Sequence, residues 1–166
     1  MIEIQTWERT SLIEILGLID EDFVNYRKCS MRIDMPHCDW KCGKENCQNY
    51  SARNNKILKI TVDSIVQRYE ANEYSEAIVI AGLEPFLSMD DLSVLIAAFR
   101  EKVSDPIIIY TGYNKEEIEK EVGRLKLLYS NIIVKFGRYI PNQEPHYDEV
   151  LGIKLASSNQ YAERIC

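Results

Sequence analysis

Three closely spaced cysteines are the residues whose type and spacing most clearly suggest chemistry. Cys38, Cys42 and Cys47 form a C-x3-C-x4-C pattern inside a polar segment. Thiolates at such short spacings can converge on one inorganic centre. A 4Fe-4S cluster held by only three protein thiolates keeps one iron open for a small ligand. The count of three therefore predicts a reactive cluster rather than one built only for electron transfer.

Two alternatives recruit a fourth thiol, that of Cys29. It would complete a structural zinc site, which is tetrahedral and often has four cysteine ligands. It would equally complete a four-cysteine iron-sulfur protein that transfers electrons. Zinc ligands commonly occur as C-x2-C pairs, and this sequence contains none, so the spacing favours iron and sulfide over zinc.

Two further motifs follow directly after short runs of apolar, largely β-branched residues. The sequence Ala-Gly-Leu-Glu-Pro at 81–85 follows the run 77–80, and Thr-Gly-Tyr at 111–113 follows the run 107–110. Such runs are typical of buried parallel strands, and open α/β folds bind ligands at the carboxyl ends of these strands. Taken alone, each motif is also explained as a turn, in which Gly82 provides a backbone conformation that other residues avoid.

The elements that must position these motifs alternate along the chain from residue 60 onward. A third strand-like run covers 132–134, and apolar residues recur at helical spacing over 62–69, 92–99 and 118–129. This alternation predicts an α/β domain with mostly parallel strands. Ser88 is expected to cap the second of these helices through its hydroxyl group.

The chain before residue 60 has a weaker pattern. Residues 12–19 fit a strand or a short helix equally well, and residues 29–35 favour a strand. Residues 36–55 have no periodicity, so we expect an ordered loop that something other than a packed core must hold.

Composition narrows the classes of protein that these motifs can belong to. The chain has 166 residues, 46% of them hydrophobic, and a net charge of −6, which indicates one globular domain over residues 1–166. Without a basic stripe, neither nucleic acid nor a membrane is expected as a partner. No signal peptide is recognised in residues 1–10 and no run of 18 apolar residues occurs, so we expect a cytoplasmic protein. In that reducing compartment, the five cysteines are not expected to form disulfides.

The order of the motifs resembles one known family. The run 31–38, the three cysteines, Asn49, the motifs at 81–85 and 111–113, and Ser-Ser-Asn-Gln at 157–160 follow one another as in the small radical S-adenosylmethionine (SAM) enzymes that activate anaerobic ribonucleoside-triphosphate reductase. The resemblance extends over most of the chain, from about Leu18 to Ile165. It implies a partial (β/α) barrel of the radical SAM type.

The resemblance also implies a set of site residues and cofactors. Cys38, Cys42 and Cys47 would bind a 4Fe-4S cluster, and SAM would bind its open iron. The remaining cofactor-binding residues implied are Gly82 and Glu84, which would hold the SAM amino group, together with Trp40 near the adenine and Thr111. No catalytic side chain is implied beyond the cluster.

By the same resemblance, one electron from a donor such as flavodoxin or ferredoxin would split SAM into methionine and a 5′-deoxyadenosyl radical. This radical would remove a hydrogen atom from a glycine of a larger glycyl-radical enzyme, with anaerobic ribonucleotide reductase as the expected partner. The chain would thus be a glycyl-radical-activating oxidoreductase.

The sequence departs from the family pattern at two places. The family spacing is C-x3-C-x2-C with an aromatic residue before the last cysteine, whereas this chain has two more residues there and Asn46 before Cys47. The second glycine of the family's Gly-Gly-Glu-Pro motif is Leu83. These departures leave one more alternative open, a non-catalytic zinc-binding or degenerate docking module.

Overall fold

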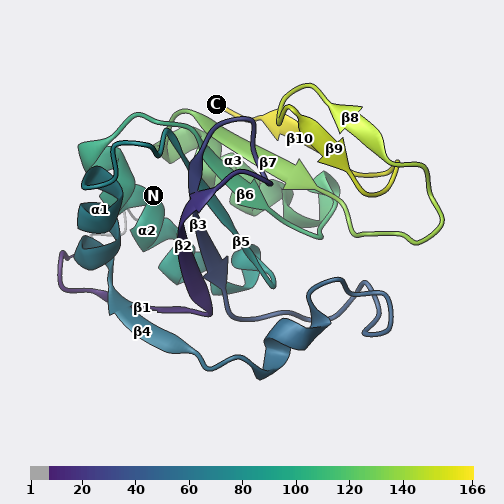
Figure 1. Ribbon diagram of the computed structural model, residues 1–166, viewed down its shortest axis with the longest axis horizontal. Helices are drawn as coiled ribbons and strands as arrows, with labels where there is room; N and C mark the ends of the chain where they lie inside the picture. The colour runs from purple at the N-terminus through teal and green to yellow at the C-terminus, as the bar shows by residue number, and fades with distance from the viewer. Residues whose placement is uncertain (1–7) are drawn as a thin grey trace.

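A six-stranded sheet forms the centre of the computed structural model, which describes residues 8–166 (Figure 1). Residues 1–7, part of the stretch in which no signal peptide is expected, lie outside the described residues. The sheet has the strand order β10-β7-β6-β5-β3-β2. Its strands are β2 (Gly17–Asp22), β3 (Ser30–Met35), β5 (Ala77–Gly82), β6 (Ile107–Tyr110), β7 (Ile132–Phe136) and β10 (Tyr161–Arg164).

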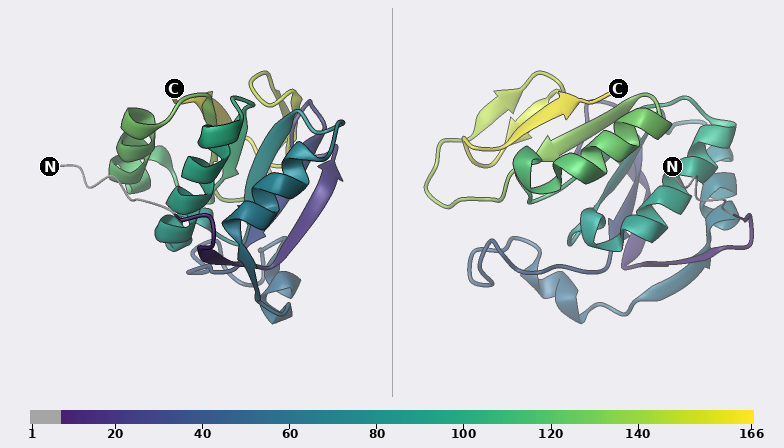
Figure 2. Two further views of the ribbon diagram at one scale, coloured as in Figure 1. Left: turned by 90° about the vertical axis from the view of Figure 1, so that its left-hand side faces the viewer. Right: turned by 180° about the vertical axis from the view of Figure 1, so that it is seen from behind.

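The four inner strands are parallel and follow one another in chain order, while β2 and β10 are antiparallel edge strands. Crossovers between parallel strands are almost always right-handed, so a sheet that grows in one direction places its helices on one face. The three helices do lie together on one side of the sheet (Figure 2). They are α1 (Val62–Glu70), α2 (Met89–Lys102) and α3 (Glu119–Leu128).

The two faces of the sheet contribute to two separate hydrophobic clusters. Alternate residues of the inner strands, such as Ile78, Ile80 and Ile109, point toward the helices in the larger cluster. Their neighbours Val79 and Ile108 point to the opposite face, which is covered by the hairpin of β8 (His146–Asp148) and β9 (Ile153–Leu155) and by Tyr26. We call this opposite side the inner face of the sheet.

A long loop and a small sheet connect β3 to α1. The loop contains a short 3-10 helix, η1 (Tyr50–Asn54), and is otherwise irregular, as expected for residues 36–55. It continues into β4 (Leu58–Thr61), which pairs antiparallel with β1 (Leu12–Ile15). Residues 12–19 are therefore strand rather than helix, interrupted at Leu16 between β1 and β2.

Helix starts differ in how their free N–H groups are satisfied. The Thr61 side chain accepts from the N–H of Ser64 at the start of α1, 3.3 Å away. The expected Ser88 cap of α2 is wrong, because the 3-10 helix η2 (Pro85–Ser88) leads directly into α2 and the Ser88 hydroxyl is buried without a hydrogen-bond partner in the described structure. A capping box of Asn114 and Glu117 begins the 3-10 helix η3 (Lys115–Ile118), which leads into α3.

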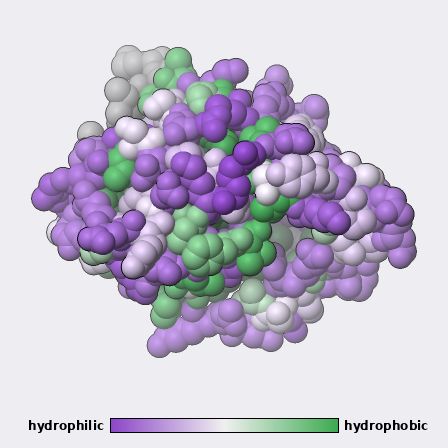
Figure 3. All heavy atoms as spheres, turned by 45° about the horizontal axis from the view of Figure 1, so that its top comes forward, coloured by the Kyte–Doolittle hydropathy of each residue, from purple (hydrophilic) through white to green (hydrophobic). Residues whose placement is uncertain are grey.

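The fold confirms the α/β class and the mostly parallel strands that the sequence predicts. Within residues 8–166, no helix has the length and apolar character needed to cross a membrane. The face drawn in Figure 3 is mostly hydrophilic, with apolar patches between the hydrophilic side chains. Among the apolar residues that are exposed are Phe23 and Val24, in the turn between β2 and β3.

Candidate metal centre

The three cysteines of the spaced motif share one cavity at the carboxyl ends of the parallel strands. This cavity has a volume of about 510 Å³, and Cys38, Cys42 and Cys47 all line it. Each of the three residues is partly buried. Burial raises the pKa of the Cys38 thiol, and burial followed by the neighbouring Cys47 and Cys38 thiols raises that of Cys42. The three sulfur atoms are therefore near enough to interact electrostatically.

The cysteine loop is attached to the end of β5 at both of its ends. At the start of the loop, the N–H of Leu83 donates to Met35 O at 3.1 Å and the N–H of Glu84 donates to His37 O at 2.7 Å. After the last cysteine, the Asn49 side-chain amide donates to Gly82 O at 3.2 Å. The β3–β5 ladder thus continues beyond the strands and fixes the backbone next to Cys38.

Gly82 makes the close approach of β3 and β5 possible. Its φ is +92°, and a Cβ built on it would lie 2.5 Å from Met35 N and 2.7 Å from Met35 O. These are backbone atoms, which cannot move aside as the end of a flexible side chain can. The backbone requirement of the turn therefore explains this glycine without any ligand.

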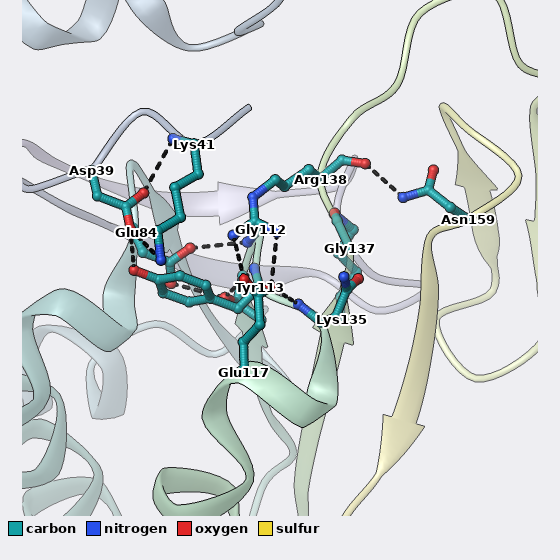
Figure 4. Close-up of polar contacts among 12 residues, drawn as sticks. Asp39, Lys41, Glu84, Gly112, Tyr113, Glu117, Lys135, Gly137, Arg138 and Asn159 are labelled. Carbon is teal, nitrogen blue, oxygen red and sulfur yellow. Dashed lines mark hydrogen bonds and ion pairs between the residues drawn. The ribbon is translucent and has the colours of Figure 1, made fainter. Parts of the chain in front are cut away.

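Glu84 is the centre of a buried hydrogen-bond network at the cavity wall (Figure 4). One of its carboxylate oxygens accepts from the Thr111 hydroxyl at 2.9 Å and from the N–H of Phe86 at 3.1 Å. The other accepts from the N–H of Gly112 at 2.9 Å. Burial raises the pKa of Glu84 in spite of these three donors. The carboxylate joins the ends of β5 and β6, and Thr111, a predicted cofactor-binding residue, serves this joint.

A second network connects the cysteine loop to the end of β6. The Tyr113 hydroxyl donates to Asp39 at 2.5 Å, and burial followed by this bond raises the pKa of Tyr113. Lys41 pairs with Asp39 at 3.4 Å, and its ammonium group lies 5.1 Å from the centre of the Tyr113 ring. Arg138 lies 5.4 Å from the same ring and forms two bonds to Glu117, whose pKa it lowers to about 2. Asp39, which lies between Cys38 and Trp40, therefore anchors the cysteine loop to the end of β6.

Residues 157–160 hold the loop that follows β7. The side-chain amide of Asn159 donates to Arg138 O at 2.8 Å, and that of Gln160 donates to Gly137 O at 3.2 Å. Ser157 bonds to both of these side chains. No chemical role is predicted for this motif from the sequence. Its contacts show that its side chains fix the backbone of Gly137 and Arg138.

Lys135 is a site residue that sequence reasoning missed. It is 7% exposed, lines the cavity, and extends from β7 on the inner face of the sheet. A lysine inside a buried strand that is otherwise apolar was the available signal, since a charged residue is seldom buried without a reason. Burial lowers the pKa of Lys135 to about 8, and the charge of Glu84 acts in the opposite direction.

Two of the five cysteines lie at the opposite edge of the sheet. Cys29 precedes β3, whose six residues at about 3.3 Å each separate it from the Cys38 loop by about 20 Å. Cys166 follows β10 and bonds through its backbone to Ile132, at the start of β7. Metal–sulfur bonds are only about 2.3 Å long. Both four-cysteine alternatives require Cys29 to lie beside the other three thiols. The structure does not bring it there.

Trp40, the residue that the resemblance places near the adenine, packs against the 3-10 helix of the cysteine loop. Its ring lies edge-on to Tyr50 with the ring centres 5.2 Å apart, and its backbone N–H donates to the Cys38 sulfur at 3.3 Å. Its φ is +59°, a left-handed conformation. Trp40 thus packs within the cysteine loop, where it supports the start of η1.

The donor set fits an iron-sulfur cluster. Among residues 8–166, no group of three or more His, Cys, Asp or Glu side chains is already arranged to hold a metal ion. The three thiols of the cavity are soft ligands. When they ionise, their negative charges repel one another, and a bound cationic centre would offset this repulsion. Cys38, Cys42 and Cys47 are therefore the residues that would hold the cluster.

Comparison with known families identifies the class of this centre. A family model described as a 4Fe-4S single cluster domain matches residues 27–161. The chain belongs to the 4Fe-4S single cluster domain family. No curated protein and no solved structure matches the chain. The match begins before β3 and ends in β10, so this 4Fe-4S domain includes the four parallel strands and the three helices as well as the cysteine loop.

Proposed function

We propose that this 4Fe-4S protein is a radical SAM enzyme. The observation that carries the proposal is that three thiols, and not four, line the cavity, while Cys29 and Cys166 lie at the other edge of the sheet. A cluster with three protein ligands has one iron free to bind the amino and carboxylate groups of SAM. When bound, the cluster supplies one electron that splits SAM into methionine and a 5′-deoxyadenosyl radical.

The chain's own residues would bind and orient SAM beside the cluster. Glu84 has a carboxylate at the cavity wall, suited to the SAM amino group, and its bonds to Thr111 and Gly112 hold it in place. Residues of the inner face of the sheet and of β9 form walls of the cavity. One-sided helices on consecutive parallel strands support a partial barrel of the radical SAM type.

The proposed substrate is a glycine of a larger glycyl-radical enzyme, in the first place an anaerobic ribonucleotide reductase. Transfer of one hydrogen atom from the glycine to the 5′-deoxyadenosyl radical yields 5′-deoxyadenosine and a glycyl radical. The electron comes from a donor of the flavodoxin or ferredoxin class. A cytoplasmic location belongs to the same proposal.

An anaerobic electron paramagnetic resonance experiment tests this proposal. The reconstituted protein is reduced with dithionite, and its spectrum is recorded with and without SAM. We expect a reduced 4Fe-4S signal that changes when SAM is added, accompanied by release of 5′-deoxyadenosine. A cluster signal unmoved by SAM would contradict the proposal and favour an electron-transfer protein.

Matched cysteine variants show which thiols matter. Cys42→Ser removes a cavity thiol, and Cys29→Ser removes one at the opposite edge. We expect the signal to disappear only in Cys42→Ser. If the two variants lose it equally, or if zinc is bound without iron, the assignment of three ligands is wrong.

A further inference from the structure

The turn between β2 and β3 presents two adjacent large apolar side chains to solvent. Phe23 is 69% exposed and Val24 is 73% exposed. Single exposed apolar residues are ordinary, whereas several at one place indicate a surface that another molecule covers. Ile19, which is 41% exposed, extends this group, because it pairs in register with the cavity-lining Arg32 and so lies on the same, inner face of the sheet. We call Ile19, Phe23 and Val24 the apolar rim.

The apolar rim borders the cavity that the three thiols line. Val24, Arg32 and Cys38 all line this cavity. Val24 precedes β3 and Cys38 follows it, so the cavity extends along the inner face over the whole length of β3, about 20 Å. Val24 is both a lining residue and largely exposed, which places an opening of the cavity at the rim. The cysteine loop lies at the other end.

Hydrogen bonds on both sides of the sheet hold the turn that carries the rim. The Asp22 carboxylate accepts from the backbone N–H of Asn25 at 3.1 Å and from its side-chain amide at 2.9 Å. The Tyr110 hydroxyl donates to Asn25 O at 2.5 Å, and the N–H of Arg27 donates to Leu151 O at 2.9 Å. A surface that is already ordered loses little conformational entropy when a partner covers it.

The size of the cavity limits what can pass the rim. A volume of about 510 Å³ is that of a small-molecule site, so the cavity admits a short segment of polypeptide but not a folded domain. Under the proposed function, a glycine of a large protein must reach the cluster. The surface of that protein around the glycine-bearing segment must then contact residues at the opening. An exposed aromatic ring with apolar neighbours is typical of the centre of such an interface.

We propose that the apolar rim, with Phe23 as its anchor, is the docking surface for the glycyl-radical partner, and that the glycine-bearing segment enters the cavity beside Val24. This inference rests on the proposed function. The partner presents an apolar surface there that receives the Phe23 ring. An electron donor or a second copy of this chain would cover the same rim with different consequences.

Direct binding tests the surface. Binding of the anaerobic ribonucleotide reductase from the same organism is measured by anaerobic isothermal titration calorimetry for the wild type, Phe23→Ser, Phe23→Leu and Leu127→Ser. Leu127 is the control, because it is 65% exposed on α3, on the helix side of the sheet (Figure 2). We expect Phe23→Ser to weaken binding at least about tenfold, Phe23→Leu to weaken it less, and Leu127→Ser to leave it unchanged. Equal affinities of wild type and Phe23→Ser, or no binding by the wild type, would overturn the proposal.

Two activities separate docking from chemistry. With dithionite as the reductant, release of 5′-deoxyadenosine without the reductase reports SAM cleavage, and the glycyl radical signal of the reductase reports its activation. We expect Phe23→Ser to release 5′-deoxyadenosine as the wild type does, and to need at least about tenfold more reductase for half-maximal activation. Because dithionite replaces the donor protein, a loss seen only when a donor protein supplies the electron would assign the rim to the donor and overturn the proposal.

The outcomes also distinguish a failure of the docking surface from a failure of the proposed function. If the wild type releases no 5′-deoxyadenosine, the proposed function fails, and the binding measurement still decides whether the reductase covers the rim. If wild type and Phe23→Ser activate the reductase equally, the proposed function stands and the docking surface is wrong. If Phe23→Ser converts a dimer of this chain into a monomer in analytical ultracentrifugation, the rim is an interface between two copies, which would also overturn the proposal.

Discussion

The parallel strands begin at one side of the sheet, the amino edge, and end at the opposite side, the carboxyl edge. Both of these edges carry cysteines and a buried tyrosine bonded to an aspartate, yet only the carboxyl edge forms the candidate centre. At the carboxyl edge, three thiols line the cavity and Tyr113 bonds to Asp39 at 2.5 Å. At the amino edge lie Cys29 and Cys166, and Tyr69 bonds to Asp105 at 2.6 Å. The residue types are thus nearly the same at the two edges.

The difference lies in what the chain does after each edge. At the carboxyl edge, residues of the loops that follow β3, β5 and β6 line the cavity. At the amino edge, Arg100 donates to the carbonyl oxygens of Val103, Ser130 and Asn131 and joins these connections. Whether a thiol is a candidate ligand therefore depends on the backbone around it and not on its residue type alone.

The largest expected effect is loss of the cluster when a thiol of the carboxyl edge is removed, with no loss when a thiol of the amino edge is removed. Cys42→Ser should reduce bound iron and sulfide to background, whereas Cys29→Ser should retain the content of the wild type, because Cys29 lies about 20 Å away across β3. Iron and acid-labile sulfide are measured after anaerobic reconstitution. Loss of iron from Cys29→Ser would remove the distinction between the edges.

The next largest effect concerns the backbone of the carboxyl edge. Gly82→Ala should lower the free energy of unfolding by about 4 kcal/mol, because the added Cβ would overlap the Met35 backbone and the φ of +92° disfavours any side chain. Gly123→Ala in α3, where a Cβ meets nothing within 4 Å, should raise it by up to about 1 kcal/mol. Urea denaturation of the cluster-free protein measures both. A Gly82→Ala protein as stable as the wild type would show that β3 and β5 need not approach so closely.

A third prediction concerns pH and the buried charge of Lys135. The pKa of this group falls from 10.5 to about 8 on folding, so its charge destabilises the fold fully below pH 8, and this cost disappears as the pH rises from 8 to 10.5. Lys135→Met should therefore stabilise the ligand-free protein by about 3 kcal/mol at pH 7 and by little near pH 10.5. Urea denaturation across this pH range is the measurement. A gain that does not depend on pH would mean that packing, and not charge, is responsible.

The smallest effect compares the two tyrosine–aspartate bonds. Tyr113→Phe and Tyr69→Phe should each lower the free energy of unfolding by about 2 kcal/mol, since each removes a partly buried hydrogen bond to a carboxylate. Only Tyr113→Phe should also alter the electron paramagnetic resonance spectrum of the reduced cluster, because Asp39 directly follows Cys38, one of the proposed cluster ligands. Identical spectra in the two variants would show that the Tyr113 bond does not position the loop.

Much of the fold was predictable from the sequence, since it rests on local patterns. The apolar runs at 77–80, 107–110 and 132–134 became β5, β6 and β7 because strands buried on both faces need apolar residues at every position. The Ser88 cap failed because Pro85 begins a 3-10 turn that extends the helix backward past the expected cap. Local spacing did not reveal that turn.

The sequence predicts which thiols belong to the candidate site, but it does not predict the contacts that support them. The spacing of Cys38, Cys42 and Cys47 identified the loop, and the family match supports a 4Fe-4S cluster. The bonds from Tyr113 to Asp39 and from Asn159 to Arg138 join residues 74 and 21 positions apart, and no periodicity signals such pairs. The distance of Cys29 from the site likewise depends on strand length and direction in the folded sheet.

The double attachment of the cysteine loop has a consequence for how the protein matures. Hydrogen bonds to the end of β5 close this loop on both sides of the cysteines, and they use backbone and amide groups rather than a metal. In small zinc domains the metal drives folding, because a stable core is lacking without it. Here the sheet and helices supply the core, so the chain can fold before iron arrives. Cluster assembly then orders only a short segment on a finished scaffold, and removal of iron by a chelator should leave a folded protein that can be loaded again.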